Sequence, residues 1–189
     1  MHCCKPDAVN QALEEFRAYL ETLTCIQIDP RLLREFSLSD IIQDTLLEAW
    51  QDLGRVEALD ADGRKRWLRT MLVHNLLEQI ERCKAKKRDF RLKEPLEAAS
   101  AGSSCRLQSW LAAEGTSPSG QAAQHEEALR VLEALSKLEA RQREALVLQR
   151  YHGWALAQIA AHLGCTAGAV AGLHARGLKK LREHLSEEK

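Results

Sequence analysis

The sequence predicts an all-α protein of two small helical domains joined by a flexible linker, with a helix-turn-helix at the end of the second domain. Three features of the 189 residues lead to this fold class. Apolar side chains recur at steps of three and four residues, with little period-two alternation. Ala, Leu, Glu and Arg are plentiful while aromatic residues make up 5% of the chain, a mixture typical of helical proteins. A stretch rich in Ala, Ser, Gly and Pro divides the chain, with its clearest break at residues 115–120.

Two helices are predicted in the first part of the chain. Residues 9–28 carry a broad apolar face, and Asp29-Pro30 ends this helix because the residue before a proline avoids the α region. Residues 31–36 are a candidate further turn. Residues 37–40 then supply an N-cap, and the second helix runs from residue 41 to about residue 53.

The helix over residues 41–53 has an apolar face and an acidic face. The apolar face, which we expect to meet the core, consists of Ile41, Ile42, Thr45, Leu46, Ala49, Trp50 and Leu53. The acidic stripe recurs every four residues and consists of Asp40, Asp44, Glu48 and Asp52. Like charges at this spacing cost a few tenths of a kcal/mol per pair in an isolated helix. The stripe is either a solvated face, helped at its first turn by the helix dipole, or a docking face for a basic protein partner.

Residues 54–66 read as a loop centred on Asp-Ala-Asp-Gly, and a second long helix begins at Trp67. Its apolar stripe continues to Cys83, and residues 82–88 add five cations within seven positions. Such an end binds phosphates, RNA or acidic lipid. Nucleic acid is favoured because little apolar bulk is left for a membrane anchor.

Residues 94–124 are predicted as the linker, in which Leu107, Trp110 and Leu111 are expected to form one helical turn that either packs loosely or docks on a partner. The second domain begins with two helices, whose apolar positions lie at residues 129–138 and 145–151. Gly153 separates them from the last fifth of the chain.

That last fifth has the order of parts of a helix-turn-helix. A short apolar stripe from Leu156 to Leu163 ends at Gly164, and Thr166 is placed to N-cap a longer helix. The longer helix ends in the cations Arg176, Lys179, Lys180 and Arg182. DNA is the natural partner of this arrangement, and a helical hairpin with a basic solvated end is the alternative.

Formal charge alternates along the chain although its sum is zero. Lys and Arg number 5 against 13 Asp and Glu in residues 1–63, and 11 against 3 in residues 64–93. They number 3 against 7 in residues 94–140, and 8 against 4 in residues 141–189. Two separate basic blocks indicate two contacts with a polyanion, and two acidic blocks indicate surfaces that face something else or only favour solubility.

Other functional classes find little support in the sequence. The six cysteines lack C-x-x-C or matched His spacing, so free thiols are expected, and no metal or cofactor is predicted. The chain lacks paired catalytic carboxylates, a Gly-rich phosphate loop and a nucleophile motif, so it is not expected to be an enzyme. Without a run of about 18 apolar residues or a signal peptide, a cytoplasmic location without membrane contact is expected.

Three ordered strings resemble bacterial sigma factors of the sigma-70 family, and the two-domain layout resembles their small extracytoplasmic function (ECF) group. The strings are SDIIQDTLLEAW at residues 39–50, WLRTMLVHN at residues 67–75 and QREALVL at residues 142–148. The resemblance implies a region 2-like domain over residues 9–93 and a region 4-like domain over residues 125–185. It implies a promoter-specificity subunit, which directs transcription initiation by recognising the minus 10 element with the first domain and the minus 35 element with the second.

The resemblance also implies partners and site residues. The partners are core RNA polymerase, through the clamp helices of its largest subunit and its flap, and promoter DNA, with an anti-sigma protein as a further candidate. Polymerase docking falls on Asp40, Asp44, Glu48 and Asp52. The DNA-contacting candidates of the first domain are Arg64, Arg66, Trp67, Arg69, Asn75, Lys84, Lys86, Lys87 and Arg88. Those of the second domain are Thr166, His174, Arg176, Lys179 and Lys180.

Residues 54–66 fall where the family holds a flipped-out base, and Trp67 is either a base contact or a core aromatic.

The second domain departs from the family pattern in its helix starts and its recognition helix. Glu139 stands where a proline is usual, and Ala155 replaces a Ser N-cap, a loss of about 1 kcal/mol, although Gln158 keeps the other half of the capping box. Gly172 and Gly177 weaken the recognition helix by about 1 kcal/mol each relative to Ala. Polar side chains for base reading are few there, so phosphate contact and groove shape are expected to contribute more. A stand-alone helix-turn-helix regulator remains the alternative function, although it leaves the acidic stripe unexplained.

Overall fold

The computed structural model describes residues 16–87, 94–114 and 120–187, and every regular element in these ranges is helical. The prediction of an all-α protein is therefore confirmed. The chain divides into two compact units, unit 1 from Met1 to Ser117 and unit 2 from Pro118 to Lys189.

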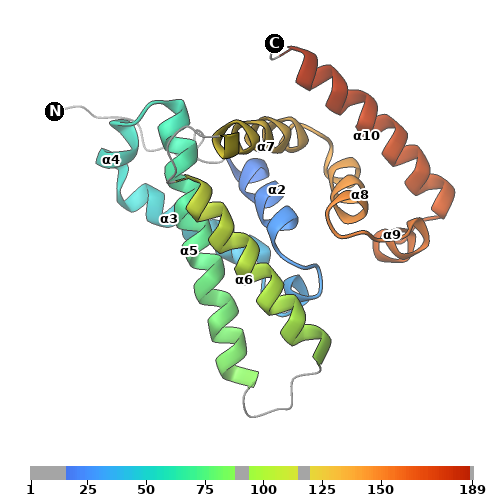
Figure 1. Cartoon of the computed structure of the whole chain (residues 1–189), viewed down its shortest axis with the longest axis horizontal. Helices are drawn as coiled ribbons and strands as arrows, with labels where there is room; N and C mark the ends of the chain where they lie inside the picture. Colours follow the sequence, from blue (N-terminus) through green and yellow to red (C-terminus); the bar gives the residue numbers. More distant parts are fainter. Residues whose placement is uncertain (1–15, 88–93, 115–119, 188–189) are drawn as a thin grey trace. The chain divides into compact units, whose positions relative to one another are not determined.

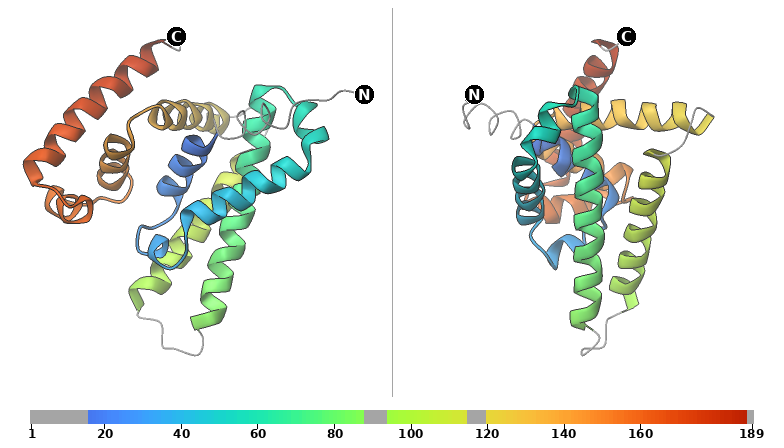
Figure 2. Two further views of the ribbon diagram at one scale, coloured as in Figure 1. Left: turned by 180° about the vertical axis from the view of Figure 1, so that it is seen from behind. Right: turned by 90° about the vertical axis from the view of Figure 1, so that its left-hand side faces the viewer.

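Unit 1 is built around α5, the helix Ala61–Lys87. Before it come α2 (Arg17–Gln27), η1 (Leu32–Arg34), α3 (Leu38–Gln51) and α4 (Leu53–Glu57), and after it comes α6 (Glu94–Glu114) (Figure 1). Helices α2, α3 and α6 all contact α5 (Figure 2). The core between them is made of fully buried side chains, which include Leu20, Leu23, Ile42, Leu68, Leu72, Leu76 and Ile80.

Unit 2 contains α7 (Gly120–Ser136), α8 (Ala140–Arg150), α9 (Leu156–Leu163) and α10 (Ala167–Glu187). Its core joins the last three helices and consists of Ala145, Leu148, Ile159, Ala160, Val170 and Leu173. Helix α10 packs on α7, α8 and α9. The helix-turn-helix predicted from residue 156 onward is thus present as α9, a turn and α10.

The predicted helix boundaries hold where a cap or a proline sets them. The Ser37 hydroxyl accepts a hydrogen bond from the Asp40 amide at 3.2 Å, which caps α3. Helix α2 ends at Gln27, two residues before Asp29-Pro30. Gly164 ends α9 in the left-handed conformation, with φ of 62°, which glycine adopts at no steric cost.

Two predicted boundaries are wrong. The loop predicted over residues 54–66 contains most of α4 and the start of α5. Helix α5 begins at Ala61 because the Asp60 carboxylate accepts a hydrogen bond from the Gly63 amide at 2.7 Å. The linker predicted over residues 94–124 is a helix packed on α5 as far as Glu114, with Leu107 fully buried. Small Ala, Ser and Gly residues read as linker composition, but here they let α6 approach its neighbours closely.

No single helix in the described ranges is both long and apolar enough to span a membrane. One pair, α9 with residues Ala167–Ser186 of α10, meets the length and composition requirements only jointly and is bent by 98° at its turn.

Candidate nucleic-acid interface

The acidic stripe lies on the exposed side of unit 1. Asp40, Asp44 and Glu48 are exposed along α3, and Asp52, also exposed, is the residue at its C-terminal end. Two large apolar side chains lie on the same helix in contact with solvent, Leu47 at 50% exposure and Trp50 at 44%. The placement of Trp50 in the core was therefore wrong. This helix face therefore presents carboxylates and two large apolar side chains to solvent together.

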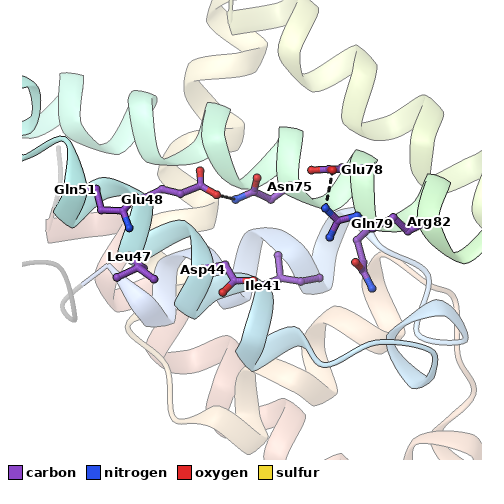
Figure 3. A pocket seen from close by; sticks show the side chains of 9 residues that line it. All are labelled: Ile41, Asp44, Leu47, Glu48, Gln51, Asn75, Glu78, Gln79 and Arg82. Carbon is purple, nitrogen blue, oxygen red and sulfur yellow. Dashed lines mark hydrogen bonds and ion pairs between the residues drawn. The ribbon is translucent and has the colours of Figure 1, made fainter.

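A groove of about 200 Å³ runs between α3 and α5 beside this stripe. Its α3 wall is formed by Ile41, Asp44, Leu47, Glu48 and Gln51, and its α5 wall by Asn75, Glu78, Gln79 and Arg82 (Figure 3). Arg82 is ion-paired with Glu78 at 2.7 Å, between exposed side chains. The α5 wall is therefore polar with its two charges paired, and the other carboxylates of the groove lie on α3.

Asn75 connects α5 with the acidic helix. Its side-chain amide donates hydrogen bonds to the Thr45 hydroxyl at 3.0 Å and to the Glu48 carboxylate at 3.3 Å (Figure 3 shows the second). Asn75, a predicted DNA contact, therefore hydrogen-bonds to α3, where one of its partners is the predicted polymerase contact Glu48.

The basic candidates on α5 differ in burial. Arg69 is only 5% exposed, and its guanidinium donates a hydrogen bond to the Tyr19 hydroxyl at 2.8 Å. The charged group of Arg69 is therefore used inside unit 1, and its predicted contact with phosphates stays a prediction. Arg66 is exposed, and Arg64 and Trp67 are half-buried.

Further along α5, the half-buried Lys84 is paired with Glu81 at 2.6 Å. The side chains of Lys86 and Lys87 and the whole of Arg88 lie outside the described residues.

In the helix-turn-helix, Thr166 and His174 have structural partners. The Thr166 hydroxyl accepts a hydrogen bond from the Ala169 amide at 3.1 Å, which confirms it as the N-cap of α10. The half-buried His174 ring has its Nε2 3.0 Å from the carbonyl oxygen of Ala145 on α8, a distance at which Nε2 donates. His174 is therefore directed toward α8, which leaves Arg176 as the remaining base-reading candidate.

The cations of α10 form the solvent-facing part of the recognition helix. Arg176, Lys179, Lys180 and Arg182 are all exposed. The guanidinium of Arg176 lies over Gly172, 3.2 Å from where a Cβ would stand. This row of cations is placed to contact a phosphate backbone.

Sequence reasoning missed the contacts that hold α9. The Arg141 guanidinium donates to the carbonyl oxygen of Leu163 at 2.7 Å, and Glu144 lies 2.9 Å from the Nε2 of His162. His162 also packs edge-on against Trp154, with ring centroids 5.4 Å apart. These contacts join the end of α9 to α8. The paired residues are 18 and 22 positions apart in the chain, so no local sequence pattern predicts these contacts.

Unit 2 also has an apolar groove of about 680 Å³ between α7, α8 and α10. Its lining includes Val131, Leu135, Tyr151, Leu178 and Leu181, of which Tyr151 and Leu178 are exposed large side chains. Leu178 on α10 therefore meets solvent at this groove. Partial burial raises the pKa of the Tyr151 hydroxyl, and the neighbouring Arg150 acts in the opposite direction.

Titratable groups in the described ranges form no cluster of three or more that could hold a metal. The four cysteines that the structure describes, Cys25, Cys83, Cys105 and Cys165, are not joined in disulfides.

The C-terminal unit matches a known family. Residues 128–181 match the family described as "Sigma-70, region 4", a span that includes α8, α9 and most of α10. No curated protein matches the chain. A solved structure to which the chain is similar is that of the sigma factor RpoE in complex with the anti-sigma factor NepR from Bartonella quintana. That similarity has 22% sequence identity, covers 96% of this chain and 94% of that chain, and has a TM-score of 0.35.

Proposed function

We propose that this chain is a promoter-specificity subunit of the sigma-70 family, whose region 4 is matched by its residues 128–181, and that it binds core RNA polymerase and directs transcription initiation. The observation that carries the proposal is the region 4 match over residues 128–181, which falls on a helix-turn-helix with a solvent-facing row of cations. The ECF group fits best, because two helical units are present without further described domains between them.

Unit 2 is proposed to bind the minus 35 element through α10. Helix α10 is capped at Thr166 and exposes Arg176, Lys179 and Lys180, which suits insertion next to a phosphate backbone. Few polar side chains remain for base edges because His174 is bonded to α8. Affinity at this element therefore comes mainly from phosphates and groove shape, and specificity is supplied jointly with the first unit.

Unit 1 is proposed to bind both polymerase and the minus 10 element. The exposed carboxylates of α3, together with Leu47 and Trp50, offer an acidic and apolar face to basic clamp helices. The solvent-facing cation Arg66 and the basic end of α5 remain the candidates for single-stranded promoter DNA, with Trp67 beside them.

The apolar groove of unit 2 is the proposed contact for the polymerase flap, since Leu178 and Tyr151 leave an exposed apolar surface beside α10. An anti-sigma protein is a further proposed partner. A subunit of RNA polymerase acts in the cytoplasm, and the role involves no catalysis by this chain.

The docking face is tested with a triple variant, Asp44→Ala, Glu48→Ala and Asp52→Ala. We expect its affinity for core polymerase to fall at least tenfold, about 1.4 kcal/mol, because three exposed carboxylates lose their cationic partners. The measurement is a fluorescence titration of labelled chain with core enzyme. The matched control, Glu97→Ala, Glu126→Ala and Glu127→Ala, removes three other exposed carboxylates and so changes the net charge equally.

Equal weakening in both triple variants would show that net charge alone controls binding and would remove the proposed docking face. A stand-alone helix-turn-helix regulator, the second candidate, would bind duplex DNA tightly and ignore core polymerase in the same titration.

A further inference from the structure

Helix α6 is attached to unit 1 by unusually small side chains. The residues that it buries most deeply are Ala99, Ser100, Ser103 and Leu107, and only Leu107 among them is large. By contrast, α5 buries Leu68, Leu72, Leu76 and Ile80 completely. Because hydrophobic stabilisation follows the apolar area removed from water, α6 is the least firmly held of the long helices of this unit.

Two buried hydroxyl groups on α6 oppose its attachment. The Oγ atoms of Ser100 and Ser104 are shielded from solvent and have no hydrogen-bond partner among the described residues. Ser100 is only 4% exposed as a whole residue. A buried polar group without a partner is destabilising, and separation of α6 from its neighbours returns both hydroxyls to water.

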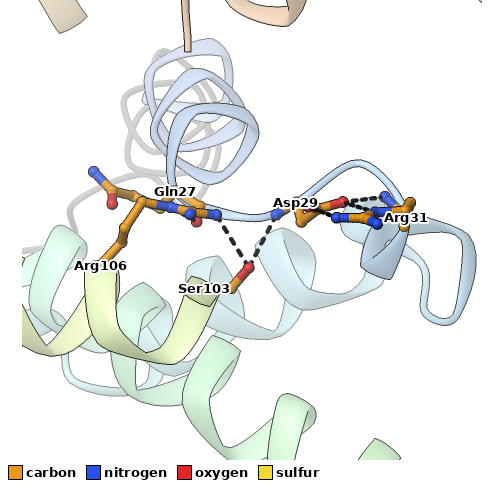
Figure 4. Close-up of polar contacts among 5 residues, drawn as sticks. All are labelled: Gln27, Asp29, Arg31, Ser103 and Arg106. Atoms are coloured by element: carbon orange, nitrogen blue, oxygen red, sulfur yellow. Dashed lines mark hydrogen bonds and ion pairs between the residues drawn. The ribbon is translucent and has the colours of Figure 1, made fainter. Parts of the chain in front are cut away.

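The polar contacts that hold α6 are concentrated at one corner, where α2 turns toward η1 (Figure 4). The Ser103 hydroxyl accepts from the Asp29 amide at 3.0 Å and from the Arg106 guanidinium at 3.2 Å. Arg106 also donates to the carbonyl oxygen of Gln27 at 2.8 Å. Asp29 itself is held by a two-point ion pair with Arg31, at 2.8 and 2.9 Å. The Asp29–Arg31 pair is exposed, whereas Ser103 is fully buried and its bonds, like those of Arg106, are partly buried, so the polar attachment of α6 depends on this one corner.

We propose that α6 is a reversible latch, which is docked on unit 1 in the free chain and released when both units bind a promoter on polymerase. The docking of α6 on unit 1 does not depend on the proposed function, but its release on a promoter does. With α6 docked, only residues 115–119 connect the two units, and five residues span at most about 18 Å. Release adds the 21 residues of α6, about 31 Å long while helical, and residues 88–93.

The tether length matters because the two proposed elements are far apart. The minus 10 and minus 35 elements are about 25 base pairs apart by their names, or about 85 Å along straight DNA at about 3.4 Å per base pair. A second binding event gains most from linkage when the tether matches the span between sites. Release of α6 would therefore widen the range of promoter spacings that one chain can bridge.

The docking is tested by hydrogen exchange on the full chain, without polymerase or DNA. We expect the α6 amides to exchange at least tenfold faster than the central α5 amides, and Ser103→Ala to increase that ratio further by removing the acceptor at the corner. Gln108→Asp, an exposed position on the same helix, is the matched control and leaves the ratio unchanged.

Leu107→Asp is a second variant, which removes the one large side chain that α6 buries completely. In this variant the α6 amides should lose protection from exchange while the α5 amides keep theirs. Equal exchange of α5 and α6 in wild type and in Ser103→Ala would overturn the latch.

The consequence is tested with core polymerase on promoters whose spacer is lengthened by two base pairs. Ser103→Ala should initiate at least threefold more often than Gln108→Asp on the long spacer, and equally on the ordinary one. Equal initiation on both spacers would overturn the role of α6 in tether length. If the wild-type chain does not bind polymerase at all, the proposed function and the tether role fail together, while the exchange ratio still decides whether α6 is a detachable helix.

Discussion

Burial divides the cations of unit 1 into structural and solvent-facing groups. Arg69 and Arg66 lie three positions apart in the same basic block, yet only Arg69 is buried and bonded to Tyr19, while Arg66 is exposed. A charge count cannot separate them, because both belong to the same run of Lys and Arg. The difference arises from which helix face meets α2.

The Tyr19 hydroxyl should therefore matter for stability. We expect Tyr19→Phe to lower the free energy of unfolding by about 1.5 to 3 kcal/mol, because a buried guanidinium loses an acceptor. Urea denaturation followed by circular dichroism measures the change. Tyr151→Phe is the matched control, since its side chain is exposed and its removal should shift stability by no more than about 0.5 kcal/mol. Equal effects would mean that the Arg69 contact adds nothing specific.

Gly177 is required by packing rather than by backbone conformation. A Cβ at this position would stand 2.9 Å from the Cδ1 of Leu146 on α8. We expect Gly177→Ala to destabilise unit 2 by about 1 to 3 kcal/mol despite the better helix propensity of alanine, because α10 must move away from α8. Thermal unfolding of the full chain measures this.

Gly172→Ala is the control for that substitution. Its Cβ would meet only the flexible end of Arg176, so the propensity gain of up to about 1 kcal/mol should appear as stabilisation. Stabilisation by both substitutions would contradict the close approach of α10 to α8.

Among elements, the helix-turn-helix follows most directly from local sequence rules. Gly164 ends α9 and Thr166 caps α10, and the side-chain Oε1 of Gln158 accepts from the Ala155 backbone amide at 2.9 Å, as the remaining half of a capping box does. Each of these contacts lies within a few residues, so spacing alone predicts them. The position of α9 against α8 depends on Arg141 and Glu144 instead, and no rule of spacing reaches across 18 or more residues.

The exposed cations of α10 make a prediction about salt. Replacing Lys179 and Lys180 by Gln should reduce the slope of log affinity against log salt for duplex DNA by about 1 to 2, since each phosphate contact adds about 0.9. Titrations of the full chain at several salt concentrations give the slope. Lys137→Gln, an exposed position between α7 and α8, should leave it unchanged. An unaltered slope in the double variant would place the DNA on another face.

Helix α6 is the element that sequence reasoning described least well. Its Ala, Ser and Gly content resembles a linker, and its only large, fully buried side chain is Leu107. Its partners, the Asp29 amide and the Gln27 carbonyl oxygen, lie more than 70 residues earlier in the chain. Composition therefore predicted a linker where the structure has a helix docked on unit 1. Likewise, Asp60 was predicted inside a loop, although Asp commonly caps helices.

At the scale of the whole molecule, the two candidate contact surfaces lie in different units. The acidic stripe and the α3–α5 groove lie in unit 1, and the region 4 match with its cation row lies in unit 2. Under the proposed function neither unit needs high affinity alone, because polymerase would hold both and make the second contact effectively intramolecular. The free chain should therefore bind duplex DNA weakly.

Promoter-directed transcription in vitro tests the central claim most directly. Core polymerase is supplied with a promoter library, with wild-type chain, with the Asp44, Glu48 and Asp52 triple variant, or with no addition, and start sites are sequenced. We predict initiation at defined start sites that requires the wild-type chain and falls at least tenfold with the triple variant. Initiation that is unchanged by the chain, together with tight duplex binding by the chain alone, would contradict a promoter-specificity subunit and indicate a stand-alone regulator.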